Sequence, residues 1–147
     1  MKLYLMRHGQ ASDVGVDPDQ GLSTNGRSEV QQLANRLVNR GLHFTRVIHS
    51  SKARARQTAE IMRATLSPGA DISEHTSIKP NDNPDTLISD INGWHQNALV
   101  VSHLPFLPML ITKLTGDSLG SISFQPATLI CLVQNNQAWE LEWVETP

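Results

Sequence analysis

An apolar run leads directly into a cation, an imidazole and a glycine in the stretch Leu3-Tyr4-Leu5-Met6-Arg7-His8-Gly9. A run this short predicts a buried strand with a turn after it. Residues at the carboxyl end of a parallel strand face the crevice in which α/β proteins bind ligands. There, the planar guanidinium of Arg7 suits phosphate or carboxylate, and His8 can act as a nucleophile or base near neutral pH. A functional site at this position needs partners from elsewhere in the chain.

A second histidine follows a second predicted strand. Residues 98–102 form the apolar run Ala-Leu-Val-Val-Ser, which stops at His103. Two strand ends of this kind lie close together if their strands are neighbours in a parallel sheet. The sequence therefore offers two imidazoles, His8 and His103, as candidates for one site.

The helix predicted over residues 52–66 begins with a concentration of positive charge. Lys52, Arg54 and Arg56 crowd its first turn, where the helix dipole disfavours each cation by roughly 0.3–1 kcal/mol. Arginine is favourable there if an anion also binds, and we assign this role to Arg54. Lys52 and Arg56 are interpreted as solvated side chains, and Ser50-Ser51 as the segment that caps the helix.

Periodicity and turn residues predict an alternation of strands and helices. A helix capped by Ser23 or Thr24 carries an amphipathic stripe from Val30 to Val38 and ends at Gly41. The other predicted elements are strands over 44–50, 71–75, 127–133 and 139–144, helices over 84–95 and 104–114, and loops over 115–126 and 134–137. This order implies an α/β fold, a three-layer sandwich with a mostly parallel central sheet and an antiparallel edge.

The composition is that of one domain of ordinary size, and it excludes several functions. The chain has 147 residues, a net charge of −2 and no run rich in lysine or arginine, so we expect no nucleic-acid partner. Its charged fraction of 18% is too low for a disordered polyelectrolyte. No apolar run approaches the roughly 20 residues of a membrane span, and none resembles a signal peptide. We therefore expect no membrane association and a cytoplasmic location.

Metal and disulfide chemistry are not expected either. The sequence has no CxxC or HExxH spacing, and Asp13, Asp17 and Asp19 in the loop over 10–21 lack the glycine and terminal glutamate of a calcium-binding loop. The single Cys131 lies in an apolar run and is interpreted as a small buried side chain. No apolar helix stripe is left over to require a dimer, so we expect a monomer.

Four polar residues at predicted strand ends and at one helix start suggest a single site. They are Arg7, His8, Arg54 and His103, and together they would make a cationic pocket for a dianion such as phosphate. The chemistry that fits is phosphoryl transfer to imidazole. Neutral His8 attacks phosphorus in line, while Arg7, Arg54 and His103 stabilise the charge on the phosphoryl oxygens. Water then attacks the phosphohistidine and regenerates the enzyme.

Four separate motifs in this order resemble the histidine phosphatase superfamily, which has the phosphoglycerate mutase-like fold. They are Arg7-His8-Gly9, Leu22-Ser23-Thr24-Asn25-Gly26, Ser50 with Arg54-Ala55-Arg56-Gln57-Thr58, and Val101-Ser102-His103. The short chain and Ser102-His103-Leu104-Pro105 resemble the SixA-type phosphohistidine phosphatases in particular.

The resemblance implies a function as well as a fold. It implies one histidine phosphatase domain over residues 1–147, with no metal and no cofactor. His8 would be the phosphoacceptor, Arg7 and Arg54 the phosphate ligands, and His103 the second histidine of the pocket. The implied reaction is hydrolysis of a P–N bond on a phosphohistidine-bearing phosphotransfer protein of a signalling system.

One departure from the larger members of the superfamily leaves alternatives open. Those members insert a helical segment whose Glu or Asp protonates the leaving oxygen, whereas the short region over 78–82 offers only Asp82, which we interpret as a turn former. SixA-type proteins share this lack, and a leaving imidazole needs less acid assistance than an alkoxide. The alternatives are a small-molecule phosphomonoesterase that uses Asp82 as its acid, or a non-catalytic phosphate-binding module. Gln20 stands where SixA-type relatives can carry a basic residue, and His49 is interpreted as a strand residue.

Overall fold

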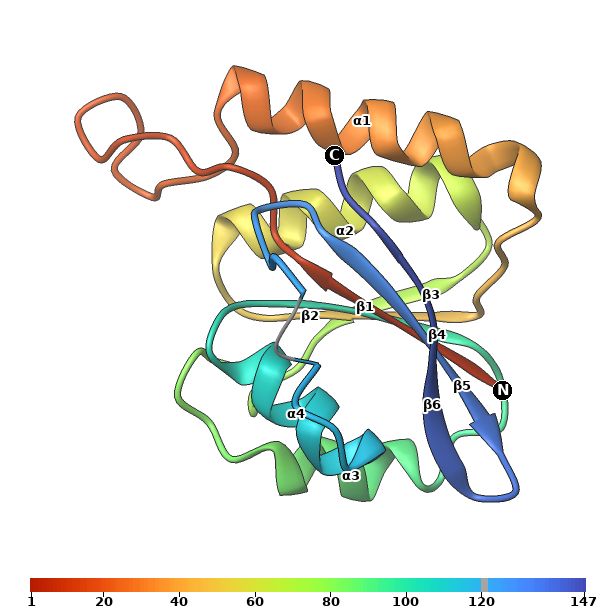
Figure 1. Ribbon diagram of the computed structural model, residues 1–147. Coiled ribbons are helices and arrows are strands. Elements are labelled where there is room, and N and C mark those ends of the chain that lie inside the picture. The colour runs from red at the N-terminus through yellow and green to blue at the C-terminus, as the bar shows by residue number, and fades with distance from the viewer. Residues whose placement is uncertain (120–121) are drawn as a thin grey trace.

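The computed structural model describes residues 1–119 and 122–147, so two residues of the loop predicted over 115–126 lie outside it. One six-stranded sheet forms the centre, with helices on both faces (Figure 1). The strands are β1 (Lys2–Arg7), β2 (Arg46–His49), β3 (Asp71–Glu74), β4 (Ala98–Ser102), β5 (Leu129–Asn135) and β6 (Ala138–Glu145). The helices are α1 (Thr24–Leu37), the short 3₁₀ helix η1 (Val38–Arg40), α2 (Ala53–Leu66), α3 (Pro84–Ile91) and α4 (Phe106–Thr115). Within the described residues, no helix is long and apolar enough to cross a lipid bilayer.

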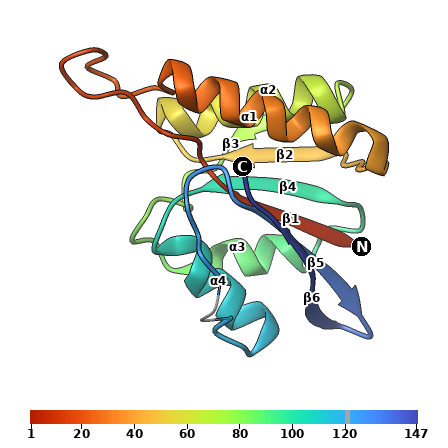
Figure 2. The ribbon, with the colours of Figure 1, turned by 45° about the horizontal axis from the view of Figure 1, so that its top comes forward.

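The sheet has the strand order β3-β2-β4-β1-β5-β6. β1, β4, β2 and β3 run parallel to one another, whereas β5 is antiparallel to β1 and β6 is antiparallel to β5. Helices α1 and α2 cover one face, and α3 and α4 cover the other (Figure 2). The predicted three-layer α/β sandwich with an antiparallel edge is therefore confirmed. Because β1 and β4 are neighbours in parallel, their carboxyl ends lie side by side.

Strand β1 is buried on both faces, as expected of a strand in the middle of such a sheet. Leu3 and Leu5 pack into the core under α3 and α4, whereas Tyr4 and Met6 pack into the core under α1 and α2. This alternation with a period of two explains why the apolar run reads as continuous. It also fixes β1 rigidly, so that the residues directly after it are held in place.

The predicted start of α1 is confirmed, whereas the ends of α1 and α3 differ from the predicted ones. The N-terminal cap of α1 is Ser23, whose side chain accepts from Gly26 N, and Gly41 ends the following 3₁₀ turn with φ of 69°. Helix α3 ends at Ile91 rather than His95, because the chain turns at Asn92-Gly93 with Gly93 N donating to Asp90 O at 2.9 Å.

The edge hairpin is tighter than predicted. Strands β5 and β6 extend to the pair Asn135–Ala138, so the turn contains only Asn136 and Gln137. Both adopt positive φ, 52° and 70°, as two-residue turns of this kind require. Asparagine tolerates this conformation well, which favours the tight turn over the predicted four-residue loop.

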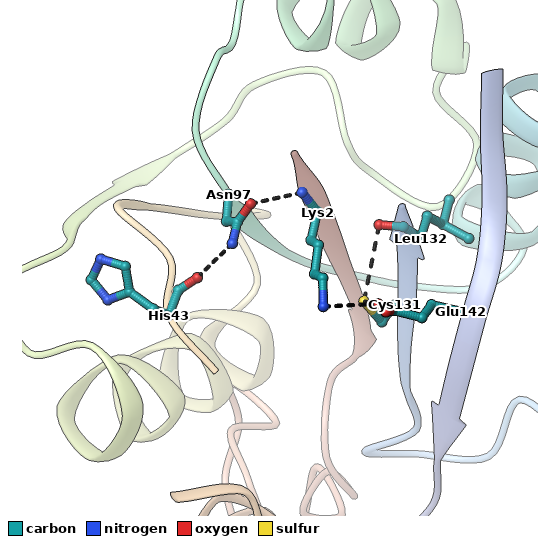
Figure 3. Close-up of polar contacts among 6 residues, drawn as sticks. All are labelled: Lys2, His43, Asn97, Cys131, Leu132 and Glu142. Carbon is teal, nitrogen blue, oxygen red and sulfur yellow. Dashed lines mark hydrogen bonds and ion pairs between the residues drawn. The ribbon is translucent and has the colours of Figure 1, made fainter. Parts of the chain in front are cut away.

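Asn97 ties three segments together at the edge of the sheet away from the site (Figure 3). Its side-chain oxygen accepts from Lys2 N at 2.7 Å and its side-chain nitrogen donates to His43 O at 3.1 Å. Nearby, Cys131 is buried as predicted, and its thiol donates to Glu142, which also pairs with Lys2 Nζ at 3.1 Å. Burial raises the pKa of the Cys131 thiol to about 12, so this cysteine is an unreactive packing residue.

Gly26 in the first turn of α1 lies against the backbone of Gln10. A Cβ at this position would lie 2.2 Å from Gln10 O and 2.9 Å from Gln10 N. We expect Gly26→Ala to lower the free energy of unfolding by up to about 2 kcal/mol, because overpacking against backbone costs about 1–3 kcal/mol and the better helix propensity of alanine returns about 1 kcal/mol. Urea unfolding measures the change.

A matched control for Gly26 is Gly69→Ala. A Cβ at Gly69 would meet nothing within 4 Å, so this variant should be as stable as the wild type. Equal stability of both variants would contradict the close approach of α1 to the chain that follows the first strand.

Candidate active site

His8 and His103 meet at the carboxyl ends of two neighbouring strands. Arg7 pairs with Ser102 in the register of β1 and β4, and His8 N donates to Ser102 O at 3.1 Å. The two imidazole rings have centroids 4.9 Å apart and planes inclined by 58°. Both residues are almost fully buried, with exposed fractions of 9% and 3%. The structure thus brings together two histidines that are far apart in the sequence.

The hydrogen bonds of His8 decide which ring nitrogen is free to react. His8 Nδ1 lies 2.7 Å from Gly9 O. Because a carbonyl oxygen can only accept, Nδ1 carries the hydrogen and the lone pair of the neutral ring is on Nε2. Burial lowers the pKa of His8 to about 4, and the charges of Arg54 and Arg7 act in the same direction, against the bond to Gly9. His8 is therefore neutral at pH 7, with Nε2 available as a nucleophile.

His103 is also neutral at pH 7, and it is held by a serine of the next strand. Its Nε2 lies 2.5 Å from Ser50 Oγ, directly after β2. Burial lowers the pKa of His103 to about 3, and the neighbouring His8 and the positive charges of Arg54, Lys52 and Arg7 act in the same direction. Ser50 was predicted to cap α2, and this is wrong. The N-cap position belongs to Lys52, without a capping side chain, because the Ser50 hydroxyl is used by His103.

Arg7 offers donors inside the site. Its Nη1 donates to Phe124 O at 2.8 Å, which fixes the guanidinium beneath the loop that precedes β5. Its Nε is buried and meets no acceptor within the described residues. Burial also lowers the pKa of Arg7, although a guanidinium stays charged in a protein. A buried cation with a donor to spare suits an anionic ligand.

Arg54 supplies a second guanidinium from the first turn of α2. Its charge lowers the pKa values of both His8 and His103, so it lies near both rings. In the described part of the chain, no carboxylate lies within ion-pair distance of Arg54 or of Lys52. Arg56, two residues on, is exposed and pairs instead with Glu60 at 3.4 Å. The first turn of α2 is thus a cationic rim, and the charge of Arg54 acts on both histidines.

A buried threonine connects this rim to the turn after β1. Thr58 Oγ1 accepts from Gly9 N at 3.0 Å and donates to Arg54 O at 2.8 Å. One hydroxyl therefore holds both the backbone beside His8 and the helical turn that carries Arg54. The sequence contains Thr58 within a motif but gives no local signal of this contact, because the residues that it joins are far apart in the chain.

The remaining candidates of the sequence analysis have other environments. Asp82 Oδ2 accepts from Lys79 N at 2.9 Å, so this carboxylate closes a turn. His49 is the last residue of β2 and is buried. Its Nδ1 lies within hydrogen-bond distance of Ser50 O, at 2.8 Å. Gln20 lines a cavity together with Arg54 and has a φ of 48°. Among the residues that the structure describes, no group of three or more His, Cys, Asp or Glu side chains is placed to hold a metal ion.

The site as a whole is suited to a tetrahedral dianion. Two neutral imidazoles adjoin each other under the influence of two guanidiniums, and no carboxylate among the described residues pairs with Arg54. A dianion bound here would be attracted by both arginines and would raise the pKa values of both histidines. The lone pair of His8 Nε2 could then attack an electrophilic phosphorus atom.

Acidification is expected to destabilise the folded protein through these two histidines. Their pKa values are about 4 for His8 and about 3 for His103 in the folded chain, against about 6.5 in an unfolded chain. Between these values the unfolded chain binds more protons, so the free energy of unfolding falls as the pH drops below about 6.5. At about 1.4 kcal/mol per pKa unit, His8 alone accounts for roughly 3 kcal/mol once the pH is below about 4.

Urea unfolding at a series of pH values tests this expectation. His8→Asn removes one of the two titrating groups, so its stability should fall less between about pH 6.5 and pH 4 than that of the wild type. Parallel stability profiles for wild type and variant would show that His8 is not the buried neutral group that its environment indicates.

Comparisons with known proteins agree with this geometry. The family model described as histidine phosphatase superfamily (branch 1) matches residues 3–79. The phosphohistidine phosphatase SixA of Escherichia coli is 29% identical over 123 residues, which are 78% of this chain and 74% of that protein. A structure of the protein histidine phosphatase SixA complexed with tungstate has a TM-score of 0.85 and 25% identity, and the match covers 98% of this chain and 96% of that chain.

The fold is shared more widely than the sequence. A phosphoglycerate mutase from Bacillus anthracis is only 15% identical but has a TM-score of 0.78, with 97% of this chain and 91% of that chain covered. The phosphoglycerate mutase-like fold that the motifs implied is therefore confirmed.

Proposed function

The chain belongs to the histidine phosphatase superfamily, and from this premise we propose that it is a phosphohistidine phosphatase that acts on a phosphotransfer protein. Membership and the SixA likeness support phosphatase chemistry. The observation that carries the proposal is the pair of neutral imidazoles 4.9 Å apart, with the reactive nitrogen of His8 turned away from its hydrogen-bonded partner Gly9 O.

The proposed reaction has two steps. In the first, His8 Nε2 attacks phosphorus in line, a new N–P bond forms, and the P–N bond to the imidazole of the substrate breaks. Arg7, Arg54 and His103 hold the phosphoryl oxygens, and the leaving imidazole takes a proton from the solvent, to which the attacking water returns one in the second step. In the second step, water attacks the phosphohistidine, which releases inorganic phosphate and restores His8. These steps use only side chains of this chain and water.

The absence of an assigned general acid favours a P–N substrate over a P–O substrate. The only carboxylate suggested for that role, Asp82, accepts a hydrogen bond from Lys79 N within its own turn. A leaving imidazole is easily protonated, whereas an alkoxide needs a positioned acid that contributes about 10²–10⁴-fold in rate. An enzyme with this site is therefore expected to prefer phosphohistidine.

The named relatives support the same substrate class. The Escherichia coli relative is called a phosphohistidine phosphatase, and the SixA structure contains tungstate, a tetrahedral oxyanion of the same shape as phosphate. We propose that the physiological substrate is a phosphohistidine-bearing phosphotransfer protein, that residues 1–147 act as one catalytic domain, and that His8, Arg7, Arg54 and His103 have the roles given above.

A panel of substrates with different leaving groups tests the proposal. The panel contains a histidine-phosphorylated phosphotransfer protein, phosphoramidate, p-nitrophenyl phosphate and glycerol phosphate. We expect kcat/KM for the P–N compounds to exceed that for glycerol phosphate by at least about 10²-fold, with p-nitrophenyl phosphate between them because its leaving group needs little acid assistance.

Two other outcomes would identify the alternatives. Strong turnover of glycerol phosphate that is lost in Asp82→Asn would indicate a small-molecule phosphomonoesterase. Phosphate binding without hydrolysis of any compound, and without a phosphoenzyme, would indicate a phosphate-binding module.

A further inference from the structure

The segment between β1 and α1 projects from the body of the molecule beside the site (Figures 1 and 2). It leaves the sheet directly after His8, and its base is closed by Ser12 N donating to Gly21 O at 2.7 Å. The Asp17 carboxylate accepts from Asp19 N at 3.0 Å and from Gly21 N at 2.9 Å. The segment is thus a projection with its own hydrogen bonds, which we call the rim loop, residues 12–21.

The rim loop exposes apolar side chains that the fold itself does not need. Val14 is 64% exposed and Val16 is 80% exposed, more than any other large hydrophobic residue among the described residues. Neither belongs to the two apolar clusters of the core. Single exposed apolar residues are common, but two on one short projection next to a catalytic pocket form a surface that a partner can cover.

A cavity separates the rim loop from the first turn of α2. It has a volume of about 460 Å³ and is lined on one side by Pro18, Asp19 and Gln20 and on the other by residues 51–54 and Arg56. Arg54 lines this cavity, and its charge also acts on both histidines, so the cavity adjoins the proposed phosphate site. Lys52 lies on the same wall, exposed and with no carboxylate within ion-pair distance in the described part of the chain.

We propose that the rim loop and the first turn of α2 form a docking surface for the phosphotransfer protein that carries the phosphohistidine. An apolar patch on that protein covers Val14 and Val16, and one of its carboxylates pairs with Lys52. This inference rests on the proposed function, because the phosphorylated side chain must enter at Arg54. Neither valine lines the cavity that Arg54 lines, so a ligand small enough to fill that cavity would leave both valines uncovered, whereas a protein could cover them.

The double variant Val14→Ser/Val16→Ser separates docking from chemistry. With a histidine-phosphorylated phosphotransfer protein as substrate, we expect KM to rise about tenfold, because both valine side chains lose their apolar burial against the partner. With phosphoramidate, kcat/KM should equal that of the wild type. The matched control is Val38→Ser, since Val38 is 50% exposed in η1, at the other end of α1.

The outcomes distinguish the two proposals. If the double variant processes the phosphoprotein with an unchanged KM, the docking surface is wrong while the phosphatase stands. An equal rise in KM for Val38→Ser would also overturn it, because the effect would not be specific to the rim loop. If the wild type hydrolyses neither the phosphoprotein nor phosphoramidate, the proposed function itself fails.

The contribution of Lys52, on the α2 side of the cavity, is tested by the salt dependence of KM. An exposed pair between Lys52 and a partner carboxylate weakens as salt screens it, so KM for the phosphoprotein should rise with ionic strength. In Lys52→Gln this dependence should be smaller, whereas Lys52→Arg should keep it. Identical salt dependence in the wild type and Lys52→Gln would exclude Lys52 from the docking surface.

Discussion

Replacing His8 with asparagine is expected to abolish the phosphoenzyme and to lower kcat for P–N substrates by at least about 10³-fold. Asparagine keeps a polar side chain beside Gly9 O but has no nitrogen lone pair that can attack phosphorus. In the wild type, Nδ1 is engaged by Gly9 O at 2.7 Å, which leaves Nε2 as the attacking atom. Native mass spectrometry at neutral or alkaline pH, after mixing with phosphoramidate, detects the phosphoenzyme directly.

His49 provides a matched control for this substitution. It is also buried at the end of a strand, and its Nδ1 also lies close to the carbonyl of the next residue, Ser50 O, at 2.8 Å. The proposed mechanism gives it no step, so His49→Asn should still form the phosphoenzyme, provided that thermal unfolding shows it to be folded. If His8→Asn still forms a phosphoenzyme, His8 is not the nucleophile. If folded His49→Asn is the one variant of the two that fails to form it, the nucleophile is not His8 either.

The positions of His8 and His103 could be predicted because each depends on a local pattern. An apolar run followed by a polar residue indicates where a buried strand ends, and parallel strands end at the same edge. The prediction of the sandwich had the same basis, since strands and helices alternate visibly along the chain. Arg54 was singled out by its unfavourable position at the positive end of a helix dipole.

The contacts that support these residues could not be predicted in the same way. Arg7 donates to Phe124 O across 117 positions of sequence, and Ser50 meets His103 across 53. A serine before a helix has the same local signature whether it caps the helix or bonds to a distant imidazole, so Ser50 was assigned the wrong partner. The approach of Gly26 to Gln10 also depends on how a helix packs, which no local pattern reports.

Lys52 illustrates a partial success of the sequence analysis. It was interpreted as a solvated side chain, and it is exposed. Its charge nevertheless contributes to the lowered pKa of His103, which shows that it lies near the rim of the site. Its exposure could be predicted from the local pattern, but its distance from a histidine that follows another strand depends on the tertiary structure.

Arg54 and Arg56 allow the role of the cationic rim to be tested within a single helical turn. Both are arginines of α2, but Arg54 acts on both histidines, whereas Arg56 is exposed and pairs with Glu60 at 3.4 Å. We expect Arg54→Gln to lower kcat/KM for phosphoramidate by about 10²–10³-fold, the usual cost of removing one donor that stabilises developing charge. Arg56→Gln should leave it within about twofold, since exposed ion pairs contribute little.

A second readout shows whether Arg54 acts through its charge at the histidines. Because its positive charge lowers the pKa values of His8 and His103, both should rise in Arg54→Gln, and NMR titration of the imidazoles measures this. Arg54→Lys should keep the low pKa values but recover only part of the activity, since an ammonium cannot make the paired hydrogen bonds of a guanidinium to two phosphoryl oxygens. Equal losses of activity in Arg54→Gln and Arg56→Gln, with unchanged histidine pKa values in both, would remove Arg54 from the proposed phosphate site and leave the guanidinium of Arg7 there.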